Sequence, residues 1–201
     1  MYERMIKMKE KLLELSNSNK NVLTSKLLLD NGYTKYHIKK MVDEQLIAKV
    51  QRGIYVLNNE LEDEFYINQM NNTSIVYSNE TALYLHNMSD RYPRPLSVTT
   101  KSGYHIRNND LKIYYTNKDL FEIGIIEINS PQGSPIKVYD KERTICDIIK
   151  NKNRIEPQVY IQGLQSYFLN SKPNLRKLSR YAKKMNIQNK VMDIVELYTK
   201  P

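Results

Sequence analysis

Cysteine is almost missing from this chain. Its 201 residues include only Cys146, which excludes an intrachain disulfide and is consistent with a reducing compartment. Cys146 lies among apolar residues in a helix-like pattern. We expect it to fill a core rather than act as a nucleophile, because a reactive thiolate needs an electropositive and partly open setting.

Long hydrophobic runs are missing as well. No stretch approaches the roughly 20 apolar residues that a membrane-spanning helix needs. The first residues, Met-Tyr-Glu-Arg-Met-Ile-Lys, lack the apolar centre of a signal peptide. We therefore expect a cytoplasmic protein with no membrane partner.

The common catalytic and cofactor motifs are also absent. The sequence contains no P-loop, dinucleotide fingerprint, HExxH, GxSxG or zinc-type cysteine pattern. We therefore expect no enzyme, no cofactor and no bound metal. The nearest approach to a nuclease is Asp110 followed by Glu127-Ile128-Asn129, because metal-dependent nucleases often carry an aspartate and a Glu-x-Lys on adjacent strands. Asn129 replaces that lysine here, which weakens the nuclease interpretation.

Charge is abundant and mostly positive. The chain has 31 Lys and Arg against 22 Asp and Glu, a net charge of +9. Residues 1–59 hold 11 basic against 6 acidic residues, residues 60–150 hold 10 against 13, and residues 151–201 hold 10 against 3. Two basic ends around a mildly acidic middle favour two separate cationic surfaces and a polyanionic partner.

The N-terminal residues predict three helices. Residues 2–15 repeat apolar side chains at helical spacing, at Met5, Met8, Leu12 and Leu15. Thr24 or Ser25 can cap a short second helix that ends at Asn31-Gly32, and Thr34 can cap a third.

A hairpin follows these helices. Residues 47–50 and 54–57 are β-prone runs separated by Gln51-Arg52-Gly53, so an arginine is expected at the tip. Helix, turn, helix and basic hairpin is the order of a winged helix-turn-helix, in which the second helix of the motif enters the major groove. We expect a DNA-binding domain over residues 1–59, although such modules also mediate protein interactions.

The expected recognition helix has one apolar and one basic face. Ile38, Met41 and Val42 recur at helical spacing and should point inward. The remaining side chains of this helix, with neighbours in the preceding helix and in the hairpin, are the expected DNA contacts: Lys26, Thr34, Lys35, Tyr36, His37, Lys39, Lys40, Lys49 and Arg52. Tyr36 and His37 are the better candidates for base discrimination, because lysines contribute mainly salt-dependent affinity.

The rest of the chain, residues 60–201, predicts an α+β domain with a small β-sheet and several helices. A polar, acidic run over residues 58–64 marks the boundary. Strands are expected over residues 75–77, 96–100, 112–115, 125–128 and 136–139. Helices are expected from Ser78 to His86, from Asp140 onward, and over residues 157–169, 174–185 and 187–198.

One polar cluster in this domain stands beside apolar positions. Its members lie at the start of the helix that Asp140 can cap: Asp140, Glu142, Arg143, Thr144 and Asp147. Arg143 and Asp147 are spaced i, i+4 and can pair. Two interpretations stay open, a surface ion pair worth roughly a few tenths of a kcal/mol or an outward arginine in a partner-binding patch.

A second cationic surface is expected on the helix over residues 174–185. Its basic face is formed by Arg176, Arg180, Lys183 and Lys184. Flanking DNA, RNA or a partner protein could each contact this face.

Three segments, in this order, resemble the AbiEi family of bacterial antitoxins. They are Arg52-Gly53-Ile54-Tyr55, then Ser78-Asn-Glu-Thr-Ala82-Leu83-Tyr-Leu-His86, then Val138-Tyr-Asp140-Lys-Glu142-Arg143-Thr144-Ile-Cys-Asp147-Ile. That family belongs to type IV toxin-antitoxin systems linked to abortive phage infection, and the resemblance covers nearly the whole chain.

The resemblance implies two roles. The N-terminal domain would bind inverted repeats in its own promoter, on double-stranded DNA, and repress the operon. The C-terminal domain would counter a nucleotidyltransferase-like toxin without forming a stable complex with it. Two alternatives remain beside this hypothesis: a one-component repressor whose C-terminal domain senses a ligand, and the metal-dependent nuclease.

Overall fold

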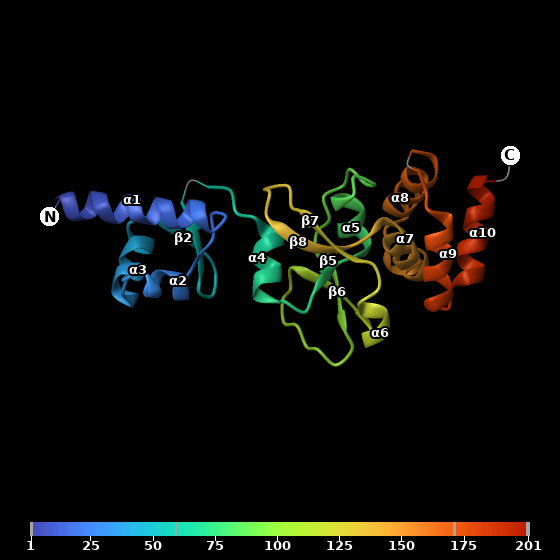
Figure 1. Cartoon of the computed structure of the whole chain (residues 1–201), viewed down its shortest axis with the longest axis horizontal. Coiled ribbons are helices and arrows are strands. Elements are labelled where there is room, and N and C mark those ends of the chain that lie inside the picture. Colours follow the sequence, from blue (N-terminus) through green and yellow to red (C-terminus); the bar gives the residue numbers. More distant parts are fainter. Residues whose placement is uncertain (1, 59, 171, 200–201) are drawn as a thin grey trace. The chain divides into compact units, whose positions relative to one another are not determined.

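The computed structural model describes the backbone of residues 2–58, 60–170 and 172–199, and their side chains from Met8 onward. It is a mixed α+β protein with two β-sheets (Figure 1). Within the described residues, no helix is both long and apolar enough to cross a membrane.

The chain divides into two compact units, Met1–Ile67 and Asn68–Pro201. We expected the boundary after residue 59, a position that lies outside the described residues. The division instead falls within a helix, α4 (Glu64–Asn71).

The N-terminal unit contains three helices and a small sheet before α4 in the part described. These elements are α1 (Tyr2–Ser18), β1 (Leu23–Thr24), α2 (Ser25–Asp30), α3 (Lys35–Asp43), β2 (Ile47–Gln51) and β3 (Ile54–Leu57). The strands pair antiparallel in the order β1-β3-β2. A core of apolar side chains joins the helices to the sheet: Leu12, Leu23, Leu28, Tyr33, Ile38, Met41 and Ile47. Met5 was expected on this apolar face, but its side chain lies outside the described residues.

Local capping explains where the short helices begin. The Thr24 Oγ1 accepts a hydrogen bond from the Leu27 N–H at 3.0 Å, and α2 starts at the next residue. The Thr34 Oγ1 accepts one from the His37 N–H at 3.2 Å at the start of α3. Each bond satisfies a backbone donor that the helix itself leaves unpaired, so both predicted caps are confirmed.

The C-terminal unit is built on a mixed five-stranded sheet. Its strands are β4 (Val76–Tyr77), β5 (Leu96–Lys101), β6 (Leu111–Thr116), β7 (Ile125–Asn129) and β8 (Pro135–Tyr139). They lie in the order β6-β5-β4-β8-β7, with β5–β6 and β4–β8 parallel and the other two pairs antiparallel. The short helix α5 (Asn79–Leu85) follows β4, and α6 (Lys118–Phe121) follows β6.

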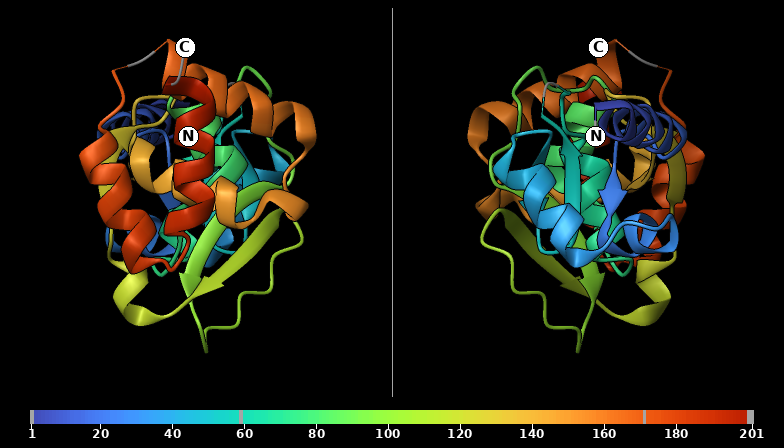
Figure 2. Two further views of the ribbon diagram at one scale, coloured as in Figure 1. Left: turned by 90° about the vertical axis from the view of Figure 1, so that its right-hand side faces the viewer. Right: turned by 90° about the vertical axis from the view of Figure 1, so that its left-hand side faces the viewer.

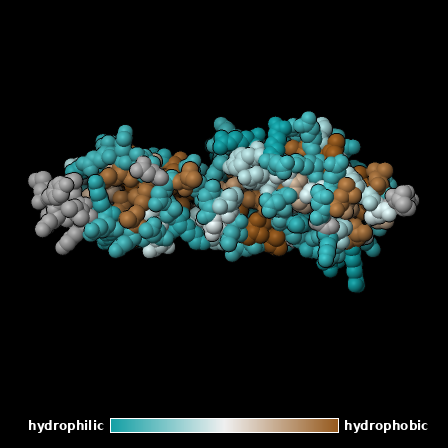
Figure 3. All heavy atoms as spheres, turned by 90° about the horizontal axis from the view of Figure 1, so that it is seen from above, coloured by the Kyte–Doolittle hydropathy of each residue, from teal (hydrophilic) through white to brown (hydrophobic). Residues whose placement is uncertain are grey.

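Four longer helices complete this unit. They are α7 (Lys141–Lys150), α8 (Pro157–Leu169), α9 (Leu175–Lys184) and α10 (Gln188–Thr199), with a 3-10 turn, η1 (Lys152–Arg154), between the first two. Figure 2 shows α9 and α10 side by side, and α9 also packs on α7. Their inward side chains form one apolar core with those of α5. On the face drawn in Figure 3, hydrophilic residues cover most of the surface of each unit, and hydrophobic residues are confined to smaller areas.

Two local features differ from the sequence-based expectation. The acidic run expected as a linker ends in a helix cap, because the Asp63 Oδ1 accepts from the Tyr66 N–H at 3.0 Å while Phe65 and Ile67 are buried. Ser78 precedes α5 but its side chain makes no capping bond. Its hydroxyl instead accepts from the Thr99 hydroxyl at 2.8 Å, which ties the start of α5 to β5.

Candidate functional site

The outer face of α3 is exposed, basic and aromatic. Tyr36 is 71% exposed, and Lys35, Lys39 and Lys40 are also exposed, whereas Ile38 and Met41 are buried beneath them. Val42, which was expected inside, is only half-buried. The helix therefore buries one apolar stripe and presents a cationic surface with an exposed tyrosine, whose ring centroid lies 6.1 Å from that of His37.

A groove runs between α3 and the hairpin of the same unit. It has a volume of about 370 Å³, and three expected DNA-binding residues line it: Lys35, Lys39 and Lys49. Ile38 and Tyr55 also line it. The structure thus brings basic side chains from a helix and from a strand around one concave surface.

The hairpin tip lies against the start of α2. The Ser25 N–H donates to the Gly53 carbonyl at 2.8 Å, and Gly53 has a φ of +77°, a backbone conformation that side chains other than glycine rarely adopt. Arg52, beside this glycine, is exposed, as is Lys26, the residue after Ser25. This backbone bond therefore joins the two segments that carry Lys26 and Arg52.

The side chains of Thr34 and His37 also cap the N-terminus of α3. The Thr34 N–H donates to the His37 Nδ1 at 3.3 Å, completing a capping box. His37 therefore has only its Nε2 available for a base edge. Lys40 is partly engaged as well, since its Nζ lies 3.6 Å from a Glu44 carboxylate oxygen.

The polar cluster at the start of α7 is buried, which corrects both interpretations of its Arg143 and Asp147. These two residues are 1% and 5% exposed, and Thr144 is 0% exposed. They form neither a surface ion pair nor an outward patch. Asp140 and Glu142 are also buried, at 6% and 8% exposed.

Arg143 makes its hydrogen bonds to groups within the fold. Its Nε lies 3.1 and 3.2 Å from the two carboxylate oxygens of Asp147. Its Nη1 donates to the carbonyls of Leu120 and Ile123, on the segment between β6 and β7. The guanidinium carbon lies 4.1 Å from the centroid of the Tyr139 ring. Burial is the largest single effect on the pKa of this guanidinium and lowers it, but the charge and hydrogen bond of Asp147 together with Tyr139 and Cys146 outweigh burial, so the pKa is raised and the arginine stays charged.

Asp140 and Glu142 join α7 to the helices that follow. Asp140 caps α7, as predicted, through its Oδ1 and the Arg143 N–H at 2.8 Å. Its Oδ2 accepts from the Tyr181 hydroxyl at 3.0 Å and pairs with the Lys177 Nζ at 3.0 Å. Lys177 also lies 3.1 Å from Glu142, so one lysine of α9 holds both carboxylates. The third segment of the family resemblance therefore joins α7 to several other elements of the C-terminal unit. We call Asp140, Glu142, Arg143 and Asp147, with the groups that they bind, the hub.

Lys177 and Gly124 belong to this hub, and the sequence reasoning missed both. Lys177 lies on α9 between the expected apolar and basic stripes, and only its partners distinguish it. Gly124 has a φ of +81°, and a Cβ there would lie 2.8 Å from the Arg143 Cβ. The available signal was a glycine directly before a strand, which often marks close backbone approach.

Cys146 is fully buried in the apolar core, as expected. Burial raises the pKa of its thiol to about 12. A thiolate at neutral pH is therefore disfavoured.

The basic face of α9 is exposed. Its members are Arg176, Arg180, Lys183 and Lys184. The Arg180 guanidinium lies 5.7 Å from the Tyr181 ring centroid. This face remains an accessible cationic surface, in contrast to the buried charges of α7.

The nuclease constellation is not assembled. Asp110 lies directly before β6 and Glu127 lies on β7, and these strands are the opposite edges of the five-stranded sheet. The expectation of adjacent strands is wrong for this pair. Among the described residues, no group of three or more His, Cys, Asp or Glu side chains is arranged to hold a metal ion.

Comparison with known proteins identifies a relative in fold only. No family model matches the chain, and no curated protein matches its sequence. Among solved structures, the chain is similar to the RV2827C protein from Mycobacterium tuberculosis, with a TM-score of 0.71 over 94% of this chain and 75% of that one. The two sequences are 9% identical, so this likeness shows a shared α+β fold and nothing about function.

Proposed function

We propose that residues 1–59 form a winged helix-turn-helix domain that binds double-stranded DNA through α3 and the β2–β3 hairpin. The observation that carries this proposal is the exposed basic surface that α3 shares with the hairpin. A helix of this kind fits a major groove, and lysines and arginines on its flanks meet phosphates. The short strand β1 supports the assignment, because it pairs with β3 and so holds the hairpin beside the helices.

We further propose that the chain is an antitoxin that represses its own operon at inverted repeats and counters a nucleotidyltransferase-like toxin. This part of the proposal is supported by the resemblance of the three sequence segments to AbiEi antitoxins. In it the C-terminal unit supplies the antitoxin activity. The exposed basic face of α9 is its proposed contact surface, because the motif on α7 is occupied by contacts within the fold.

Arg52→Ala tests the DNA-binding role. The expected result is weaker binding to the upstream region of its own gene, with the slope of log K against log salt reduced by about one, since one phosphate contact releases roughly one counterion. Fluorescence anisotropy at several salt concentrations measures both quantities. Lys9→Ala, at an exposed position of α1, is the matched control and should leave the slope unchanged.

Unchanged binding by a folded Arg52→Ala protein would remove the hairpin from the interface. Equal affinity of the wild type for its own upstream region and for arbitrary DNA would contradict the repressor role. Arg52→Ala should still relieve toxin-induced growth arrest, whereas reversal of charge at Arg176 and Arg180 should impair relief and leave repression intact. Loss of both activities in either variant would contradict separate roles for the two units.

A further inference from the structure

The edge strands of the two sheets differ in how well their main-chain groups are protected from other chains. A strand at a sheet edge presents unpaired N–H and C=O groups, and native proteins block such edges with very short strands, lysines, bulges or covering segments. The five-stranded sheet ends in β6 and β7, and the N-terminal sheet ends in β1 and β2. Within the described residues, such protection is found at β6, β1 and β2 but not at β7.

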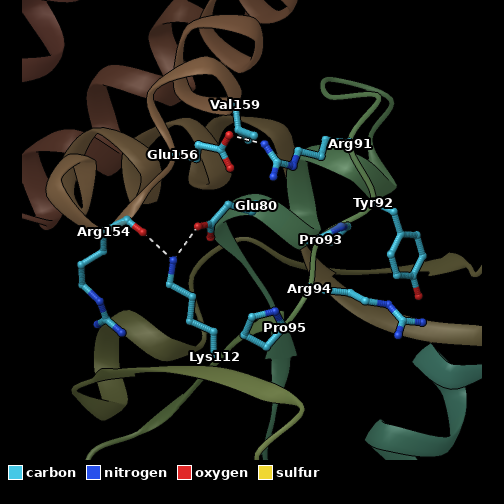
Figure 4. A pocket seen from close by; sticks show the side chains of 10 residues that line it. All are labelled: Glu80, Arg91, Tyr92, Pro93, Arg94, Pro95, Lys112, Arg154, Glu156 and Val159. Atoms are coloured by element: carbon cyan, nitrogen blue, oxygen red, sulfur yellow. Dashed lines mark hydrogen bonds and ion pairs between the residues drawn. The ribbon is translucent and has the colours of Figure 1, made fainter.

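The β6 edge is covered by the turn η1. The Arg154 guanidinium donates to the Ile113 carbonyl of β6 at 3.3 Å, and its central carbon lies 4.0 Å from the Tyr114 ring centroid. Figure 4 shows that Lys112, on the same strand, donates to the Arg154 carbonyl and to Glu80. An approaching strand would have to displace these contacts before it could pair with β6.

The edges of the N-terminal sheet are blocked in other ways. The strand β1 has only two residues, Leu23 and Thr24. The strand β2 carries Lys49, and its pairing with β3 shifts register between Lys49 and Gln51. A register shift of this kind bends and twists a strand, and a charged side chain at an edge opposes pairing with another sheet.

The strand β7 differs from these three edges. Its five residues, Ile-Ile-Glu-Ile-Asn, include neither lysine nor proline, and their register with β8 is unbroken. Ile126 is 37% exposed, and Glu127 and Asn129 are exposed as well. Isoleucine also favours the strand conformation. In the part of the chain that the structure describes, β7 is therefore the edge best suited to accept another strand.

The ladder between β7 and β8 determines which main-chain groups face outward. At its two ends, the Asp140 N–H donates to the Gly124 carbonyl at 2.7 Å and the Ser130 N–H donates to the Ser134 carbonyl at 2.8 Å. Hydrogen-bonded and non-hydrogen-bonded pairs alternate along an antiparallel ladder, so every second residue of β7 turns its N–H and C=O away from β8. These outward residues are Ile125, Glu127 and Asn129.

We propose that β7 pairs antiparallel with β7 of a second copy of this chain, with Ile126 opposite the partner's Ile126. Ile125 and Glu127 then exchange main-chain hydrogen bonds with the partner's Glu127 and the partner's Ile125. The second copy is the occupant because the strand is complementary to itself in this register. Such a pair has two-fold symmetry by construction.

The side chains select this register over its neighbours. A pair centred on Ile126 brings two exposed apolar side chains together and keeps the two Glu127 carboxylates from standing directly opposite each other. A pair centred on Glu127 would oppose like charges, which destabilises a sheet. A pair centred on Ile128 would place Pro131, which has no N–H, opposite the outward groups of Ile125.

Sedimentation equilibrium of the full chain without DNA, at roughly 10–300 µM, tests the proposal. The wild type should form a reversible dimer. Glu127→Pro should weaken this dimer at least about tenfold, because each chain loses an N–H that only the partner uses. The variant should fold, since proline is tolerated at an edge position whose N–H faces outward. Glu127→Ala is the matched control, because it keeps the N–H and should dimerise like the wild type.

Disulfide cross-linking tests the register. Residues opposite each other in a non-hydrogen-bonded antiparallel pair have Cα atoms about 4.5 Å apart, within the range of a disulfide. Ile126→Cys should therefore cross-link two chains under mild oxidation, whereas Ile128→Cys, on the same strand but farther from the two-fold axis, should not. The native Cys146 is 0% exposed and does not compete.

A chain that stays monomeric over this concentration range would overturn the proposal. A dimer unaffected both by Glu127→Pro and by Ile126→Lys, which adds a charge at the edge, would overturn it as well. Cross-linking no greater at residue 126 than at residue 128 would also contradict it. Two-fold symmetry matches the inverted repeats of the proposed function, but the inference does not rest on DNA binding. Arg52→Ala should dimerise like the wild type, so failure of either proposal can be recognised separately.

Discussion

The buried pair of Arg143 and Asp147 makes a quantitative prediction about stability. Asp147→Asn keeps the shape of the side chain and removes its charge, leaving a guanidinium at 1% exposure without a counter-charge. Breaking a buried pair from one side typically costs about 3–5 kcal/mol. For a unit of this size, such a loss should lower the melting temperature by roughly 10–20 °C.

The double variant Arg143→Met/Asp147→Leu distinguishes the energy of the ion pair from the energy of the other contacts of Arg143. It removes both charges, so it should be more stable than either single variant, with a coupling energy of about 2–3 kcal/mol. It should not regain full stability, because the carbonyls of Leu120 and Ile123 lose the donor that Arg143 provides. A buried carbonyl without a partner costs roughly 1–3 kcal/mol.

Urea unfolding followed by far-UV circular dichroism measures these differences, since the chain has no tryptophan. The control is Glu44→Gln, which breaks a pair of the same i, i+4 spacing at an exposed position and should cost less than about 1 kcal/mol. If Asp147→Asn stays within about 1 kcal/mol of the wild type, the pair is not buried and the account of α7 as a hub is wrong.

Two further predictions concern the same hub. Gly124→Ala should destabilise the protein by roughly 1–3 kcal/mol more than Gly133→Ala. Both glycines have a positive φ, but only a Cβ at residue 124 would meet another atom within 4 Å. Equal losses of unfolding free energy in urea would contradict the close approach of Gly124 to Arg143. Burial lowers the pKa of His86, whose Nε2 donates to the Tyr139 carbonyl at 2.7 Å, so the unfolded chain binds this proton first. The free energy of unfolding should therefore fall as the pH drops below about 6.5, the usual histidine pKa. The slope of this free energy against pH should be flatter in His86→Gln than in the wild type. Identical slopes in the two proteins would show that the pKa of His86 does not change on folding.

Features that depend on local sequence were predictable. Thr34 and Asp140 each stand before an amphipathic run, and a capping side chain needs only the next three residues to act. The strands of the hairpin followed from the β-prone runs on either side of Gln51-Arg52-Gly53. The helix α4 was not predicted, because Asp63, its cap, lies inside an acidic run that has the composition of a linker.

The orientation of Arg143 could not be predicted from spacing. Its position on α7 is compatible with an outward arginine, and the side chain points inward because two carbonyls 20 and 23 residues earlier in the chain accept its protons. The failed pairing of Asp110 with Glu127 has the same origin. Asp110 lies directly before β6 and Glu127 lies within β7, and the sequence places each near a strand, but the order of strands in the sheet depends on contacts distant in sequence.

The division between buried and exposed charge decides how substitutions in this protein should be interpreted. Replacing Asp140, Arg143 or Asp147 removes a hydrogen-bond partner from at least one buried group, so any lost activity must first be separated from lost folding. Replacing Arg176 or Arg180 leaves no buried group unpaired, since both side chains are exposed. A loss of the proposed toxin neutralisation with unchanged thermal stability therefore identifies a contact surface only at exposed positions such as Arg176 and Arg180. The basic face of α9, rather than the motif on α7, is where a partner should be sought.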